Sequence, residues 1–380
     1  MEQIYLDHAA TTPIHPTVLE KINNVSSDVF GNPSSIHQIG RKTRKYLDGA
    51  RHILAKSIHA NENEIVFTSG GTEADNLAII GTALKNRQNG NHVITTEQEH
   101  HAVLHAFEML EELDFRVTYL PVNEKGIVRM EDLKQALTDD TILVSVMFVN
   151  NETGTIQPIK EIGELLFDHQ AYFHTDAVQA YGLLDIDVED LHVDLLATSA
   201  HKIYGPKGIG FLYIRNGVHV KSLTVGGNQE HLHRAGTENI SGIIGFQHSV
   251  QLLSHERTHR FDIYRQYRES FLKALDEHDI TYTINGDEVN GLPSILNISF
   301  PGISVEALLM NLDLAGISAS SGSACTAGSI QPSHVLVAMY GKDDERIHSS
   351  VRFSFGNLNS TENIKEAAKR TAVIINRMEK

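Results

Sequence analysis

The sequence predicts an α/β fold in which helices cover a mostly parallel β-sheet, followed by a smaller α+β domain. Two observations support this prediction. Short apolar runs typical of strands alternate with helix-like segments through the first two-thirds of the 380 residues. Beyond about residue 250, long polar helices and short strands replace this alternation. Strands that alternate with helices usually form a parallel sheet with helical layers on its faces.

The strands of the large sheet can be followed in order. The first is the run EIVFT at 64–68, which leads through two glycines into the helix-like TEADNLAIIGTALK. A helix is expected at 159–170, and a strand at 210–214 should pair antiparallel after a Gly/Pro turn. The other expected strands lie at 92–96, 116–122, 141–150, 171–177 and 193–200. Polar residues end several of these runs, and parallel sheets bind ligands beyond the carboxyl ends of their strands.

The last third of the chain predicts the second domain. We expect a long polar helix at 254–277, a strand at 294–300, a helix at 305–316 and a final helix from Thr361. No internal repeat or low-complexity linker separates the two parts, so they should pack closely. We place the large domain at 12–252, and the small domain at 253–380 together with 1–11.

Composition limits the function classes. The chain is 41% hydrophobic and 21% charged, as in ordinary globular proteins. It has no apolar run of about 18 residues, and its first residues do not resemble a secretory signal. One cysteine excludes an internal disulfide, so we expect a cytoplasmic protein. The formal charge of −16 argues against direct binding to nucleic acid or anionic lipid and leaves room for a basic protein partner.

Two strand ends carry residues suited to carbonyl chemistry. The segment SAHKIYGPKG places Ser199, His201 and Lys202 at the end of an apolar strand. A partly desolvated lysine can form a Schiff base, although most isolated loop lysines are only solvated. Asp176 ends the strand AYFHTD, where it could cap a helix or pair with a protonated pyridine nitrogen.

Three further motifs complete a pattern. The run TSGGTEADN places two glycines and Thr72 at the start of an expected helix. This turn either binds an anion through its free backbone N–H groups or is an ordinary helix start. His100 follows a strand end, where it could stack on a cofactor or lie exposed. Arg352 lies within an apolar strand and needs either a substrate carboxylate or an internal Asp or Glu as its partner. Together, a phosphate site, a stacking His, an Asp and a Lys indicate a site for pyridoxal 5′-phosphate.

These residues stand in ordered motifs that resemble a cysteine desulfurase of the NifS/IscS type. This group belongs to the class V aminotransferases, within the fold-type I enzymes that bind pyridoxal phosphate. The similarity extends over nearly the whole chain, through YLDHAATTP, FGNPSSIH, TSGGTEADN, EHHAV, VNNETG, HTDAVQA, SAHKIYGPKG, RAGTEN, SGSACTAGS and VRFSFG. It implies a fold-type I architecture and a homodimer with sites near the interface.

The resemblance also implies a role for each matching residue. Lys202 would hold the cofactor as a Schiff base, His100 would stack on the ring and move protons, and Asp176 would pair with the pyridine nitrogen. No metal site is expected. The other implied residues are Gln179 at the ring hydroxyl, Asn151 beside the ring, Gly71, Thr72, Ser199 and His201 at the phosphate, Thr237 at the phosphate of the other subunit, and Arg352 and Asn32 at the substrate carboxylate.

Cys325 is the only cysteine and lies in ISASSGSACTAGSIQP, at 317–332, which we expect to be a flexible loop. In the family, the cysteine of this motif attacks the sulfur of the cysteine–cofactor adduct, becomes a persulfide and releases alanine. The substrate would therefore be L-cysteine. The persulfide would pass to a protein acceptor, either an iron–sulfur scaffold or a tRNA-thiolating enzyme. A flexible loop would let the thiol reach both the cofactor and that acceptor.

Other functions stay open at this point. One is a selenocysteine lyase, or another pyridoxal phosphate-dependent enzyme that removes a β-substituent. Others are a cofactor-free hydrolase in which a histidine activates Cys325, and a non-catalytic sulfur carrier. The chain also departs from the family pattern at Asn228, His231 and His233, and has His8 where a tyrosine is usual.

Overall fold

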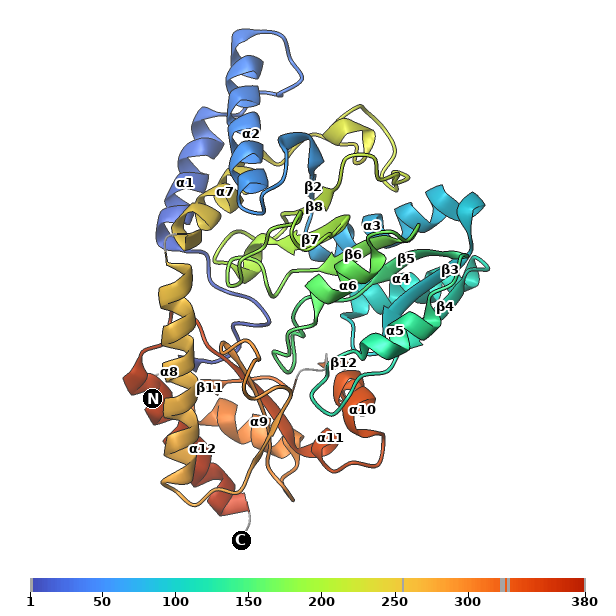
Figure 1. The fold of residues 1–380 in the computed structure, drawn as a ribbon. Helices are drawn as coiled ribbons and strands as arrows, with labels where there is room; N and C mark the ends of the chain where they lie inside the picture. Colours follow the sequence, from blue (N-terminus) through green and yellow to red (C-terminus); the bar gives the residue numbers. More distant parts are fainter. Residues whose placement is uncertain (1–2, 255, 322–324, 327–328, 379–380) are drawn as a thin grey trace.

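A computed structural model describes residues 3–254, 256–321, 325–326 and 329–378. Figure 1 shows a large sheet with its helices above a smaller group of strands and helices, which contains both ends of the described chain. No helix in these ranges is long and apolar enough to cross a membrane.

The large sheet confirms the predicted strands. Among the described residues it has seven strands in the order β2-β8-β7-β6-β5-β3-β4. Strand β8 runs antiparallel to both of its neighbours, as predicted, and the remaining pairs are parallel. The predicted run at 141–150 is a strand only as far as Ser145. The strands are β2 (Ile65–Thr68), β3 (His92–Thr96), β4 (Arg116–Leu120), β5 (Thr141–Ser145), β6 (Tyr172–Asp176), β7 (Leu195–Ser199) and β8 (Gly210–Ile214).

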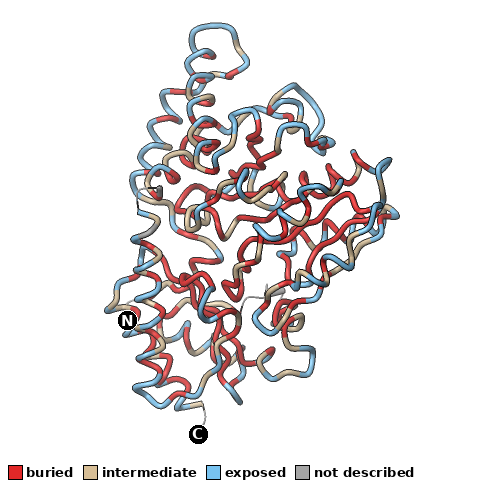
Figure 2. Tube along the Cα trace, in the orientation of Figure 1, coloured by how far each residue is buried: buried red, intermediate tan, exposed pale blue. Residues whose placement is uncertain are grey.

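Helices cover both faces of this sheet because its strands are apolar on both sides. Neighbouring side chains in a strand point to opposite faces, and Val66 accordingly packs in a different core from Ile65 and Phe67. Figure 2 shows these strands as a buried layer between partly exposed helices. One core includes α3 (Gly71–Asn86) and α4 (His101–Glu112), and the other includes α2 (Gln38–Lys56), α5 (Met130–Ala136), α6 (Ile159–Leu166) and α7 (Ile240–Ser254).

The smaller body has its own apolar core. An antiparallel sheet of β9 (Thr283–Asn285), β10 (Ile295–Ser299) and β14 (Ser350–Ser354) packs with helices α8 (Arg257–Asp276), α9 (Val305–Leu314) and α12 (Thr361–Met378). Ile4 and Leu6 belong to the same core, and β1 (Ile4–Tyr5) pairs with β11 (Ile317–Ser318). This packing supports our proposal that 1–11 and 253–380 form the small domain and 12–252 the large one.

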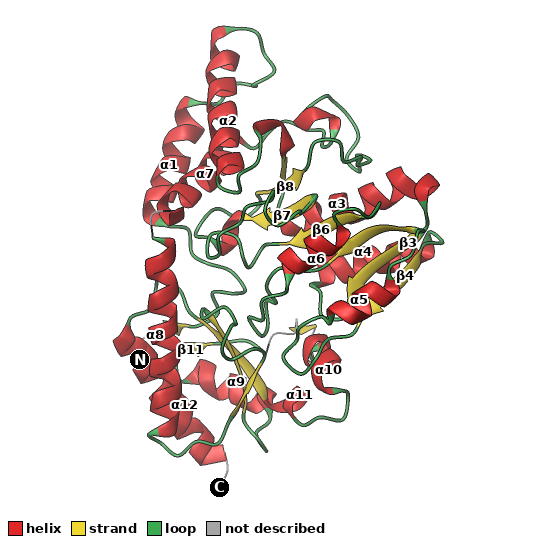
Figure 3. Ribbon diagram, viewed as in Figure 1, coloured by secondary structure: helices red, strands yellow, loops and turns green. Residues whose placement is uncertain are grey.

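Several elements differ from the sequence predictions. The segment around Cys325 is not a loop throughout, because β11 opens it and β12 (Cys325–Thr326) pairs antiparallel with β13 (Ser329–Ile330). The helix expected at 159–170 ends at Leu166. Figure 3 shows further helices that the sequence did not predict. They include α1 (Pro16–Asp28), α2, α5, α7, α10 (His334–Tyr340), α11 (Arg346–Ser349) and the short 3₁₀ helices η1 (Glu62–Glu64), η2 (Arg87–Asn89), η3 (Ala200–Lys202) and η4 (Glu230–Leu232).

Candidate active site

Lys202 ends the 3₁₀ helix η3, directly after strand β7. Its Nζ donates hydrogen bonds to the backbone oxygens of Ala9 at 2.5 Å and Ala10 at 2.9 Å. Burial of the amine, together with the positive charge of Arg352, lowers the pKa of Lys202 to about 8. Roughly a tenth of the amine is therefore unprotonated at neutral pH, far more than for an ordinary lysine, and this is the form that attacks a carbonyl.

Asp176 ends β6, the strand beside β7, and its Oδ1 accepts the Val178 N–H at 2.9 Å. Burial raises the pKa of Asp176 to about 6, although that hydrogen bond and the charge of Lys202 oppose the rise. Sequence reasoning missed two buried carboxyls nearby, Asp75 and Glu99, even though both stand in the quoted motifs. Burial raises the pKa of Glu99 to about 8 and that of Asp75 well above its usual range, and the charge of Asp176 adds to both shifts.

His100 caps the N-terminus of α4, where its Nδ1 accepts the Ala102 N–H at 3.1 Å. Because Nδ1 is the acceptor, the neutral ring carries its proton on Nε2. The residue is exposed, but desolvation of the ring by the surrounding protein and the charge of Lys202 lower the pKa of His100 to about 4. The ring is therefore neutral and can stack on a flat cofactor.

The turn between β2 and α3 forms a backbone cradle. Gly70 has a φ of 153°, which only glycine adopts readily, and a Cβ on Gly71 would lie 2.7 Å from Val178 Cγ2. Ser199 faces this turn, since a Cβ on Gly70 would lie 3.7 Å from its Oγ. The first N–H groups of a helix have no intrahelical partner, so the first turn of α3, with exposed Thr72, can receive a phosphate.

The N-terminal segment joins two other predicted residues to this site. Gln179 Nε2 donates to the same Ala9 oxygen that holds Lys202, at 3.0 Å. His201 Nδ1 lies 3.1 Å from Thr11 Oγ1. Residues 9–11 therefore contact three of the side chains that the sequence assigned to the cofactor.

Thr237 and Asn32 lie apart from Lys202. Thr237 is exposed and lines a cavity of about 150 Å³ that also includes Ser69, next to the glycine turn. Asn32 is exposed in the connection between α1 and α2, where its Oδ1 accepts the Ser34 N–H at 2.8 Å. Figure 1 shows this connection at the end of the molecule away from the small domain. Within one chain, the structure does not bring Asn32 to Arg352.

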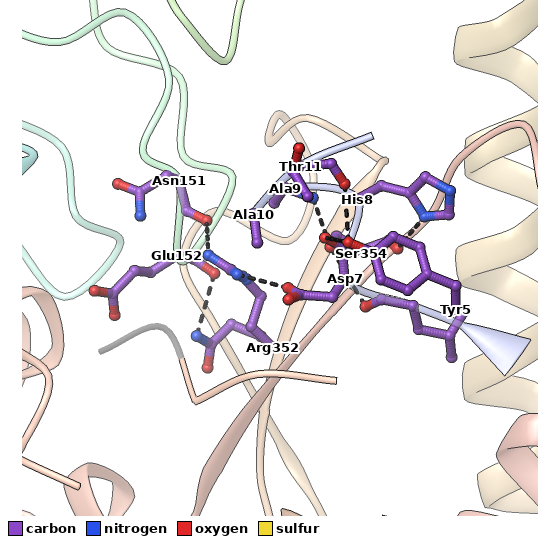
Figure 4. Close-up of polar contacts among 12 residues, drawn as sticks. Tyr5, Asp7, His8, Ala9, Ala10, Thr11, Asn151, Glu152, Arg352 and Ser354 are labelled. Atoms are coloured by element: carbon purple, nitrogen blue, oxygen red, sulfur yellow. Dashed lines mark hydrogen bonds and ion pairs between the residues drawn. The ribbon is translucent and has the colours of Figure 1, made fainter. Parts of the chain in front are cut away.

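Arg352 lies on β14 with its side chain 5% exposed. One terminal nitrogen donates to Asp7 Oδ1 at 2.8 Å and the other to the Asn151 backbone oxygen at 2.9 Å (Figure 4). Of the two kinds of partner that the sequence left open for Arg352, the internal carboxylate is present. No local pattern pointed to Asp7, because 345 positions separate the pair.

The segment that contains Cys325 is held at both ends by residues of this region. Before it, Ser320 forms an antiparallel bridge with Arg352. After it, the hydroxyl of Ser333, which caps α10, donates to the buried carboxylate of Glu152. The thiol-bearing hairpin is therefore attached to the arginine strand on one side and to the VNNETG segment on the other.

These residues fit pyridoxal 5′-phosphate. The amine of Lys202 suits a Schiff base, the carboxyl of Asp176 suits the pyridine nitrogen, and the glycine cradle before α3 suits the phosphate. All three lie at strand ends of one α/β sheet, where such folds bind ligands. Fold and site together define a pyridoxal phosphate-dependent enzyme.

Comparison with known proteins gives the same result. Residues 4–366 match the family described as Aminotransferase class-V, and the chain belongs to this family. A Bacillus subtilis (strain 168) protein named "Putative cysteine desulfurase IscS 1" is 55% identical over 378 residues, which cover 100% of both chains. The "Cysteine desulfurase IscS" of Clostridium botulinum (Type A) is 49% identical over 96% of this chain and 92% of its own.

Solved structures agree in fold. A "NifS-like protein" has a TM-score of 0.92 and 33% identity, and the match covers 99% of this chain and 100% of that one. A structure titled "SspA in complex with cysteine" has a TM-score of 0.81 and 36% identity, over 92% of this chain and 98% of that one. The predicted fold class and family are confirmed.

Proposed function

We propose that the protein is a cysteine desulfurase, which removes sulfur from L-cysteine, releases L-alanine and leaves a persulfide on Cys325. The observation that carries this proposal is the amine of Lys202. Burial lowers its pKa, and the charges of Arg352 and Asp176 also act on it. A site that acts on an amino acid needs these three groups. The lysine amine is displaced by the substrate amine, the guanidinium binds the substrate carboxylate, and the acid pairs with the cofactor ring. Full-length similarity to proteins named cysteine desulfurase supports the same reaction. A cofactor-free hydrolase or sulfur carrier loses support, because the family is pyridoxal phosphate-dependent.

When bound, pyridoxal phosphate supplies an electron sink for negative charge at the substrate Cα. Lys202 would hold it through Nζ, Asp176 would bond to the pyridine nitrogen and His100 would stack on the ring. The remaining contacts would come from Gln179 at the ring oxygen, Asn151 beside the ring, and Gly71, Thr72, Ser199 and His201 at the phosphate.

The chain's own residues then carry the proton and sulfur transfers. Arg352 binds the substrate carboxylate, and the unprotonated Nζ of Lys202 takes the Cα proton. The Cys325 thiolate attacks the substrate sulfur, so that an S–S bond forms and the Cβ–S bond breaks, with its electron pair left on the substrate. Lys202 returns a proton to Cα, Cβ takes the Nε2–H proton of His100, and the proton that Cys325 lost replaces it on Nε2. The products are alanine and a Cys325 persulfide.

The first test is L-cysteine added to the cofactor-loaded protein without reductant. We expect alanine in the supernatant and a one-sulfur increase in intact mass, which Cys325→Ser removes. Lys202→Ala should abolish both signals. A wild-type protein that binds the cofactor but forms no alanine would contradict the proposal, and selenocysteine would then be the next substrate to test.

Homodimer formation and sulfur delivery follow from the same proposal. Thr237, which is exposed in the single chain, would contact the phosphate bound by the partner subunit. The acceptor would be an iron–sulfur scaffold or a tRNA-thiolating enzyme in the cytoplasm, and the formal charge of −16 would favour one with a basic surface. Transfer of labelled sulfur from Cys325 to each purified acceptor tests this assignment directly.

A further inference from the structure

The guanidinium of Arg352 is oriented by partners that use only part of its hydrogen-bonding capacity. Asp7 and the Asn151 backbone oxygen each accept from one terminal nitrogen, at 2.8 Å and 2.9 Å. The Nε–H is buried and has no partner in the described part of the chain. Since a guanidinium carries five N–H donors, several remain for a ligand while the group is already held in place.

The backbone next to Asp7 is held from two sides. The Leu6 N–H donates to the Ser318 oxygen at 2.8 Å, and the Leu6 oxygen accepts the Ser354 N–H at 2.7 Å. Asp7 itself forms a parallel bridge with Ser354. Its carboxylate therefore points at Arg352 from a fixed backbone, as Figure 4 shows.

The same segment also contacts the second cation of the site. Two and three residues after Asp7, the oxygens of Ala9 and Ala10 accept hydrogen bonds from Lys202. Burial lowers the pKa of Lys202, the charge of Arg352 lowers it further and the charge of Asp7 raises it. Asp7 thus offsets the repulsion between two neighbouring cations, both of which the substrate must meet.

We propose that Asp7 is a positioning residue for the substrate. It holds one terminal nitrogen of Arg352, so that the remaining N–H donors, with Nε–H among them, receive the α-carboxylate of the amino acid. The inference rests on the proposed role of Arg352 as the carboxylate site. Without Asp7, the buried guanidinium would turn toward other acceptors and meet the substrate in a poorer geometry. The effect should fall mainly on substrate binding, because Asp7 contacts Arg352 directly and touches no reacting atom, while its charge is the smallest of the influences on Lys202.

The first measurement is steady-state kinetics with L-cysteine. Asp7→Ala should raise KM about tenfold or more and leave kcat within about twofold, which is the pattern of a lost contact that ground state and transition state share. Asp7→Asn should have a smaller effect, because its amide oxygen can accept the same hydrogen bond. An unchanged KM in Asp7→Ala, or a fall in kcat alone, would overturn the inference.

Ligand binding separates a positioning role from a merely structural one. L-alanine has the α-carboxylate, whereas 2-aminoethanethiol lacks it, and calorimetry with the cofactor-loaded protein measures both. Asp7→Ala should weaken the binding of L-alanine by the same factor as it raises KM. It should leave the affinity for 2-aminoethanethiol unchanged. In an Arg352→Ala background, Asp7→Ala should have no further effect. Equal weakening of both ligands, or an undiminished effect without Arg352, would show that Asp7 acts only on the fold.

A matched control is Asp344→Asn, which removes another carboxylate that contacts an arginine, Arg346, at 2.6 Å. It should change neither KM nor L-alanine binding.

The two proposals, the desulfurase activity and the role of Asp7, would be contradicted by different results. A wild-type protein that binds L-alanine but does not turn over L-cysteine contradicts the proposed function, while the ratio of L-alanine affinities still decides the role of Asp7.

Discussion

The surroundings of Lys202, more than its residue type, determine its chemistry. Among the described residues, its Nζ contacts two backbone oxygens and no carboxylate, so burial dominates and lowers its pKa to about 8. Lys160 shows the opposite case. It lies on the surface, 2.7 Å from Asp190, and that hydrogen bond raises its pKa. Only the first lysine provides a neutral amine near physiological pH.

This difference predicts how the cofactor-free protein reacts with pyridoxal phosphate. A neutral amine is the nucleophile, so the rate should increase with pH and level off above about 8, the pKa of Lys202. The growth of the imine absorbance measures this rate. Lys202→Ala should remove the signal, whereas Lys207→Ala, at an exposed lysine in the next turn, should leave it unchanged. A midpoint near 10 would contradict the lowered pKa.

Much of the site could be predicted because its residues stand in short local patterns. Asp176 ends an apolar strand, Lys202 follows one by three residues, and the glycine pair stands at a helix start, so each appears within a few positions of the sequence. Asp7 and Arg352 form one contact although 345 positions separate them. No local spacing encodes such a pair, and it emerges only when the N-terminal segment packs beside β14.

At the scale of elements, a buried ion pair fixes the segment at 226–237. Its η4 turn contains three successive residues with positive φ: Glu230 at 46°, His231 at 54° and Leu232 at 71°. The Glu230 carboxylate accepts from both terminal nitrogens of Arg51, at 2.7 and 2.9 Å, and from the Phe67 N–H at 2.8 Å. The sequence drew attention to the histidines of this segment, but the residue that anchors it is Glu230.

Removal of Glu230 should therefore be costly. In Glu230→Ala, Arg51 becomes an unpaired buried charge, and the loss of one partner of such a pair typically costs about 3–5 kcal/mol. We expect the free energy of urea unfolding to fall by that amount. Asp48→Ala removes the partner of Arg44 from a pair that is about half exposed, and should cost less than about 1 kcal/mol. Similar losses in the two variants would refute an anchoring role for Glu230.

At the scale of the whole molecule, the N-terminal segment connects the two bodies. Ile4 and Leu6 pack in the small core, and Thr12 joins the large domain through hydrogen bonds of 2.8 Å to the His201 oxygen and the Tyr204 N–H. The positions of the large-sheet strands along the chain followed from local apolar runs, so the sequence predicted them, whereas their order in the sheet came only from the structure. The α1 helix was not predicted, although Val18, Ile22 and Val25 recur along it at helical spacing.

Buried neutral histidines predict acid sensitivity of the whole fold. Burial lowers the pKa of His8 to about 4 and that of His174 to about 3, whereas both would titrate near 6.5 when unfolded. A lowered histidine pKa contributes stability above 6.5 that is lost as the pH falls, at about 1.4 kcal/mol per pH unit for each group. In His8→Phe, the unfolding free energy should fall less steeply between pH 6.5 and 4. The slope should decrease by the contribution of one proton, about 1.4 kcal/mol per pH unit. An unchanged slope would show that His8 is charged in the native state.

The site itself is proposed to extend across two subunits, and mixed dimers test this. Thr237→Val should weaken pyridoxal phosphate binding, and Lys202→Ala should abolish turnover. In a dimer with one subunit of each kind, the site with an intact Lys202 receives Thr237 from the Lys202→Ala partner. That site should regain wild-type cofactor affinity, and about half of the dimers in an equal mixture should contain it. Thr237 also lines a cavity beside Ser69 of its own chain. If it acts there instead, each mixed dimer keeps the weakened site, and mixing restores nothing.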